Sequence, residues 1–163
     1  MNKTTWVVVA DEAIARILEW PKKGKELQSV EELTDPTAHA SGSDLRRDAE
    51  GRRAGSATHS ASPHNAHRLR SSADVTSSAG EDAQHQEAER FARRVADHLA
   101  QALQQQRFDE LRVVAAPRFL GLLRKAWSAQ VQATIKDELN KDLIHAENRE
   151  LTQRLFPDAS AGA

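Results

Sequence analysis

The chain contains no cysteine, so disulfide bonds, thiol nucleophiles and thiolate metal sites are all excluded. It also lacks a long hydrophobic run. The apolar stretch at residues 6–10 is too short for a signal peptide or a membrane span, and Asp11 and Glu12 follow it directly. The formal net charge is only −1, so no overall excess of charge attracts nucleic acid or a membrane. We therefore expect a cytoplasmic protein without membrane contact, in which any binding to a polyanion depends on a local basic segment.

The first half of the sequence shows the pattern of an antiparallel hairpin. Residues 6–9 are a continuous apolar run, Trp-Val-Val-Val, as in a strand that is covered on both faces. A short turn leads to a second strand over residues 15–20, which Pro21 and Gly24 end. Residues 25–34 predict a third strand, although their apolar residues are spaced by three instead of two.

The second half predicts alternating helices and strands, at residues 81–108 (helix), 111–116 (strand), 117–127 (helix), 131–135 (strand) and 144–155 (helix). Apolar residues recur at three and four in the first of these helices, which is the period of an amphipathic helix. Together with the antiparallel first half, this alternation predicts an α/β fold with a mixed sheet flanked by helices. We expect one domain over residues 1–157, with a disordered tail at residues 158–163.

Between the two halves, residues 35–80 lose any pattern of secondary structure. The segment is rich in Arg, Ser, His and Ala, contains no aromatic residue, and holds only three sizeable aliphatic side chains, Leu45, Leu69 and Val75. It cannot bury enough apolar surface to offset its ordering entropy, roughly 1–2 kcal/mol per residue. We therefore expect a long flexible loop, and loops of such length inside a domain are usually functional or disordered.

Six arginines are concentrated between residues 46 and 70 of this loop, where the only acids are Asp48 and Glu50. The local balance between residues 46 and 70 is thus +4. The arginines and the two glycines that would let the backbone approach a ligand are Arg46, Arg47, Gly51, Arg52, Arg53, Gly55, Arg68 and Arg70. Arginine pairs with phosphate through a planar fork, and the segment has no aromatic ring for base stacking. The pattern predicts an arm that binds RNA phosphates and shape; the alternative is a solvated linker.

A second candidate position is Arg118. Pro117 directly after a buried strand is typical of the first residue of a helix, and a helix N-terminus at such a junction favours anions. Arg118 would lie on the first turn and could contact a phosphate. The alternative is that the segment serves only packing, with Phe119 in the core and Gly121 allowing helix and sheet to approach closely.

No catalytic residue, metal site or cofactor site is predicted. His59, His64 and His67 have the spacing of metal ligands but lie in the flexible loop, which offers no firm scaffold. Ser56 and His59 lack an orienting carboxylate for nucleophilic catalysis. Asp11 follows the first strand and is the one acid placed by chain position for a metal-dependent reaction.

Three segments together carry a resemblance to a known family: "WVVVADEAIARIL" (6–18), "DLRRDAEGRRAGS" (44–56) and "FDELRVVAAPRFLGLLRK" (108–125). They resemble the bacterial host attachment proteins, and the resemblance covers nearly the whole chain. That family is similar to the middle domain of archaeal and eukaryotic peptide-chain release factors. The resemblance implies an RNase H-like fold and a ribosome-associated role. The chain has no Gly-Gly-Gln sequence, so it does not imply peptidyl-tRNA hydrolysis by the release-factor route.

Three functions follow as hypotheses. The first is a non-enzymatic protein that binds RNA or the ribosome, through tRNA or ribosomal RNA, with the Arg-rich loop. The second is a hydrolase of a tRNA ester or a phosphodiester that depends on Asp11. The third is a protein-interaction factor linked to host attachment, in which the loop docks on a protein partner.

Overall fold

The computed structural model describes residues 2–37 and 69–160. Its centre is a five-stranded sheet in the order β3-β2-β1-β4-β5, formed by β1 (Thr5–Ala10), β2 (Ile14–Glu19), β3 (Gln28–Thr34), β4 (Glu110–Ala115) and β5 (Ile135–Asn140). The first three strands form an antiparallel meander, while β4 pairs parallel with β1 and β5 parallel with β4. The predicted α/β fold with a mixed sheet is therefore confirmed, and so is the third strand.

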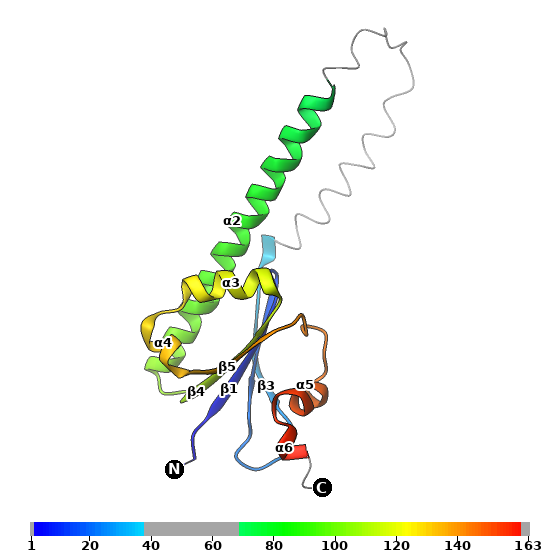
Figure 1. The fold of residues 1–163 in the computed structure, drawn as a ribbon. Coiled ribbons are helices and arrows are strands. Elements are labelled where there is room, and N and C mark those ends of the chain that lie inside the picture. The colour runs from blue at the N-terminus through cyan, green and yellow to red at the C-terminus, as the bar shows by residue number, and fades with distance from the viewer. Residues whose placement is uncertain (1, 38–68, 161–163) are drawn as a thin grey trace.

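Helices cover both faces of this sheet (Figure 1). One face carries α2 (Leu69–Gln104), α3 (Pro117–Ala126) and α4 (Ala129–Thr134), and the other carries α5 (Asn148–Leu155), followed by α6 (Pro157–Ser160). Alternate residues of β1 enter the two layers: Trp6, Val8 and Ala10 contact the α2 side, whereas Val7 and Val9 contact the α5 side. Burial on both faces explains why β1 is a continuous apolar run.

A polar contact fixes α2 against the outer strand β3. His98 Nε2 lies 2.8 Å and the Arg107 guanidinium 3.2 Å from the same oxygen, Glu31 Oε1. The guanidinium of Arg107 also lies 4.8 Å from the centre of the Trp6 ring, which stacks on Phe108. The C-terminal end of α2 is thereby held over β1 and β3, while its N-terminal part extends beyond the sheet (Figure 1).

The turn between β2 and β3 requires a glycine. Gly24 has a φ of +149°, and a Cβ at this position would lie 3.1 Å from Pro21 Cγ. Pro21 and Gly24 therefore end the hairpin as predicted. Gly121 differs from its prediction: a Cβ there would meet no atom within 4 Å, so close packing against the sheet does not require this glycine.

Several boundaries differ from those predicted. α2 begins at Leu69, inside the segment predicted as a loop, and its residues 79–86 are all exposed, so no buried stripe marks them as helical. The prediction of a strand at residues 131–135 is wrong, because the Ser128 side chain accepts from Val131 N and caps α4. The strand follows as β5, a charged edge strand without apolar alternation. At the C-terminal end, Ile144 precedes α5, and Asp158–Ser160 belong to α6 instead of a disordered tail.

Candidate functional site

One edge of the sheet gathers the C-terminal ends of four strands. β1, β4 and β5 run parallel, and β3 runs in the same direction because two antiparallel steps separate it from β1. We call this edge, with the residues that follow Ala10, Thr34, Ala115 and Asn140, the carboxyl edge. Ligands of open α/β sheets bind outside such strand ends, so the carboxyl edge is the first place to look for a site.

Arg118 lies at the carboxyl edge, on the first helical turn where the sequence predicts it. Pro117 is the first residue of α3, directly after β4, and Arg118 follows on the first turn with an exposed side chain. The N-cap residue Ala116 offers no side-chain acceptor, and the first turn contains no acid. The first amide groups of a helix have no partner within it, so this turn combines free donors with a cation.

A pocket of about 270 Å³ adjoins Arg118. It lies between the turn after β1, helix α2 and the start of α3, and its lining residues are Glu12, Glu81, Gln84, His85 and Arg118. His85 Nε2 lies 3.4 Å from Glu89 Oε1, one helical turn further along α2. The pocket thus mixes two carboxylates with an arginine and a histidine. It suits a small polar group, and its charge alone does not select an anion.

The predicted arginine cluster lies mostly outside the described residues. This holds for Arg46, Arg47, Gly51, Arg52, Arg53, Gly55 and Arg68, and equally for the histidines and Ser56. Arg70 lies in the first turn of α2, and only its backbone is described. The segment that carries the cluster follows the C-terminal end of β3 and precedes α2, which extends outward beyond the sheet (Figure 1). Residues 35–37, which precede the segment, follow β3 at the carboxyl edge, the edge at which Arg118 also lies.

Asp11 serves the turn between β1 and β2. Its Oδ1 accepts from the backbone amides of Ala13 and Ile14, both at 2.8 Å. Two further acids lie elsewhere: Asp109 precedes β4 at the opposite edge, where its Oδ2 accepts from Thr4 N at 2.7 Å, and Asp137 lies on β5, in register with Arg112 of β4. In residues 2–37 and 69–160 no group of three His, Asp or Glu could hold a metal ion. The geometry does not assemble the carboxylates that a two-metal hydrolase needs.

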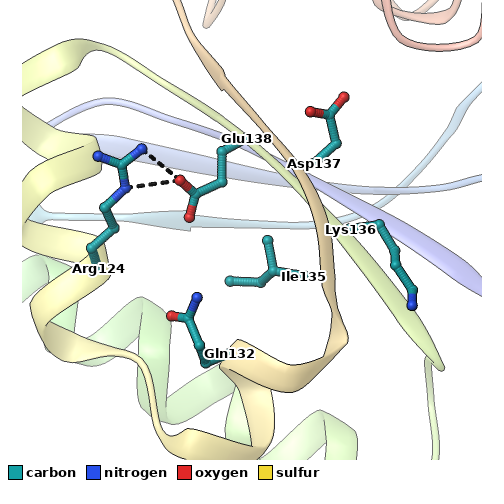
Figure 2. Close-up of a pocket in the computed structure, with 6 residues that line it drawn as sticks. All are labelled: Arg124, Gln132, Ile135, Lys136, Asp137 and Glu138. Carbon is teal, nitrogen blue, oxygen red and sulfur yellow. Dashed lines mark hydrogen bonds and ion pairs between the residues drawn. The ribbon is translucent and has the colours of Figure 1, made fainter.

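Arg124 is a further α3 cation that lines a pocket, and it is already paired. Figure 2 shows Arg124 and Glu138 pointing toward each other across a pocket of about 490 Å³, with Nε and Nη2 of the arginine 2.8 and 2.6 Å from Glu138 Oε2. Lys136 and Asp137 point away from this pair. The ion pair joins α3 to the edge strand β5, so Arg124 serves the fold more directly than a ligand.

Comparison with known proteins supports the resemblance of the sequence to a family. The family model described as "Protein required for attachment to host cells" matches residues 6–155. No curated protein matches the sequence. Among the helices in the described part of the chain, none has the length and apolar character to cross a membrane.

Proposed function

The chain belongs to the family of proteins required for attachment to host cells, and from this premise we propose that it is a non-enzymatic binding protein for RNA or the ribosome. In this proposal the Arg-rich segment 46–70 holds RNA phosphates, and Arg118 adds a contact from the body. The protein would act in the cytoplasm, on tRNA or ribosomal RNA. The observation that supports the proposal is that β3, after which the chain continues into this segment, ends at the same edge at which Arg118 lies.

The sheet supports the finer kinship with the release-factor middle domain that the resemblance implies. Its order is β3-β2-β1-β4-β5, and β2 alone runs against the other four strands. This order and these directions support the RNase H-like fold that the resemblance implies. The hydrolase alternative has less support, because Asp11 is engaged in its turn, and Asp109 and Asp137 lie away from it. A binding role needs only the cations.

We expect the double variant Arg52→Ala/Arg53→Ala to lose co-sedimentation with ribosomes at low salt while remaining folded. Each lost phosphate contact removes about 0.7–0.9 from the slope of log K against log salt concentration, so two contacts remove about 1.5. The measurement is co-sedimentation with ribosomes between about 50 and 200 mM salt.

The matched control is Arg149→Ala/Arg154→Ala, which removes the same charge from two exposed positions on α5, on the opposite face of the sheet from α2. It should retain both the affinity and the salt slope of the original protein. Equal losses of co-sedimentation in the two double variants would mean that the effect comes from net charge alone. No loss in either would remove the arm from the proposal.

A single variant, Arg118→Ala, tests the contact from the body. We expect a loss of about three- to tenfold in ribosome affinity and a decrease of about 0.8 in the salt slope, because one phosphate contact disappears. The melting temperature should stay unchanged, since the side chain is exposed. The same co-sedimentation series measures this, and a salt slope equal to that of the original protein would exclude Arg118 from the interface.

A further inference from the structure

A second pocket lies at the opposite edge of the sheet, near the start of β1 and the end of β2. It has a volume of about 320 Å³ and is lined by Asn2, Lys3, Trp20, Pro21 and Lys22. Trp20 directly follows β2, and its backbone amide donates to Thr5 O at 2.9 Å, which fixes the start of the turn to β1. None of the carboxyl-edge residues discussed above lines this pocket.

Trp20 is held in a three-layer stack. Its ring lies on that of Phe156, with the ring centres 4.3 Å apart and the planes 20° from parallel. The guanidinium of Arg112 lies 4.2 Å from the centre of the Phe156 ring and donates to Leu155 O, at the end of α5. Phe156 covers one face of Trp20, and Trp20 also packs against the core on the α5 side, so only the exposed part of its ring lines the pocket. The partly exposed indole is therefore a rigid, pre-ordered surface.

The pocket pairs this aromatic surface with cations. Lys3 and Lys22 line it, and none of its five lining residues is acidic. Lys3 Nζ lies 3.0 Å from Glu110 Oε1, yet 66% of its side chain is exposed, so it can turn toward a ligand. Lys23 and Lys25 follow in the same turn. The other two tryptophans are buried, Trp6 to 1% and Trp127 to 8% exposure, and serve the core.

We propose that Trp20 is a stacking surface for a nucleobase, and that Lys3 and Lys22 hold the phosphate attached to that base. An aromatic side chain beside positive charge is the combination that binds single-stranded nucleic acid without reading its sequence. The ligand is one nucleotide unit, supplied either by single-stranded RNA or by a free nucleotide. The inference does not depend on the proposed function, because a free nucleotide would occupy the same site.

The test uses the full chain and three probes: fluorescein-labelled U8 RNA, uridine 5′-monophosphate and inorganic phosphate. U8 binding is followed by fluorescence anisotropy. Binding of the monophosphate is followed by quenching of tryptophan emission, to which the partly exposed Trp20 should contribute most. We expect saturable quenching by the monophosphate and none by phosphate alone. Trp20→Leu should weaken U8 binding about 5- to 100-fold, and Trp20→Phe should retain most of it, because a phenyl ring still stacks.

Lys22→Glu keeps the test valid if Trp20→Leu loses stability, since Lys22 is an exposed side chain. It should weaken U8 binding at least threefold, while the matched variant Lys136→Glu, exposed on edge strand β5, should not change it. Weakening of U8 alone, without quenching by the monophosphate, identifies RNA as the source of the nucleotide. U8 affinity that is equal in the original protein, Trp20→Leu and Lys22→Glu, together with no saturable quenching by the monophosphate, would overturn the inference. The proposed function would survive that result if Arg52→Ala/Arg53→Ala still lost binding.

Discussion

Replacing Phe119 with alanine is expected to lower the free energy of unfolding by about 3–5 kcal/mol. Phe119 lies on the first turn of α3 and is fully buried. Its ring stacks on Phe91 of α2, with the ring centres 5.8 Å apart. The substitution removes an aromatic contact between α2 and α3, which cover one face of the sheet together with α4. Urea denaturation followed by circular dichroism measures the loss, with the slope m expected to stay constant.

Two further variants make this result specific. Phe119→Leu keeps an apolar side chain of similar volume and should cost clearly less than the alanine variant. Arg118→Ala, at the neighbouring exposed position, should change stability by no more than about 0.5 kcal/mol. Because natural domains have only about 5–15 kcal/mol of stability, this loss is a large fraction of the total. A loss below about 1 kcal/mol would mean that α3 does not hold the core as described.

The elements that the sequence predicts well are those whose burial dictates their composition. β1 is apolar at every buried position because both of its faces are covered, and β4 repeats this pattern next to it. α3 is recognisable because Pro117 marks its first turn and because Phe119, Leu120, Leu122 and Leu123 form one buried face. In each case a local rule and the tertiary environment agree, so the pattern leads to the correct element.

The elements that the sequence predicts wrongly are those that bury little apolar surface. β5 lies at the edge of the sheet and reads Ile-Lys-Asp-Glu-Leu-Asn, in which charged residues outnumber apolar ones. Charged edge strands avoid pairing with other chains, at the expense of a recognisable strand pattern. The β-branched residues of α4 are typical of a strand, so the sequence predicts a strand there. The segment is a helix because the Ser128 side chain accepts from Val131 N and caps it. The start of α2 is hidden for the same reason, since its residues 79–86 face solvent.

The candidate sites also differ in how far the sequence alone predicts them. The position of Arg118 on the first turn of a helix follows from the sequence alone, because a proline after a buried strand marks where the helix begins. Glu81, Gln84 and His85 meet it only because α2 passes the carboxyl edge, which depends on tertiary packing. Trp20 is the functional candidate that sequence reasoning missed. Its neighbourhood, Trp-Pro-Lys-Lys-Gly-Lys, joins an aromatic residue to three lysines and could have been noticed, but the supporting stack on Phe156 comes from the far end of the chain.

Replacing Arg16 with methionine is expected to destabilise the protein by about 2–3 kcal/mol. The guanidinium donates to Ile144 O at 2.9 Å, Ala146 O at 2.7 Å and Asn148 Oδ1 at 2.8 Å, and so joins β2 to the segment that leads into α5. Methionine retains an apolar stem but leaves these three acceptors without their donor, and hydrogen bonds to charged groups are the strong ones. Urea denaturation gives the overall loss.

Amide hydrogen exchange separates this local effect from a general one. α5 should lose protection in Arg16→Met before β1 and β4 do, because the lost bonds hold the layer that α5 forms over the sheet. Arg16→Lys should restore only part of the stability, since an ammonium group cannot reproduce the planar fork that reaches three acceptors. Arg149→Ala, which removes an exposed arginine from α5 itself, is the control and should stay within about 0.5 kcal/mol of the original protein. Unchanged protection of α5 in Arg16→Met would mean that apolar packing alone attaches this layer.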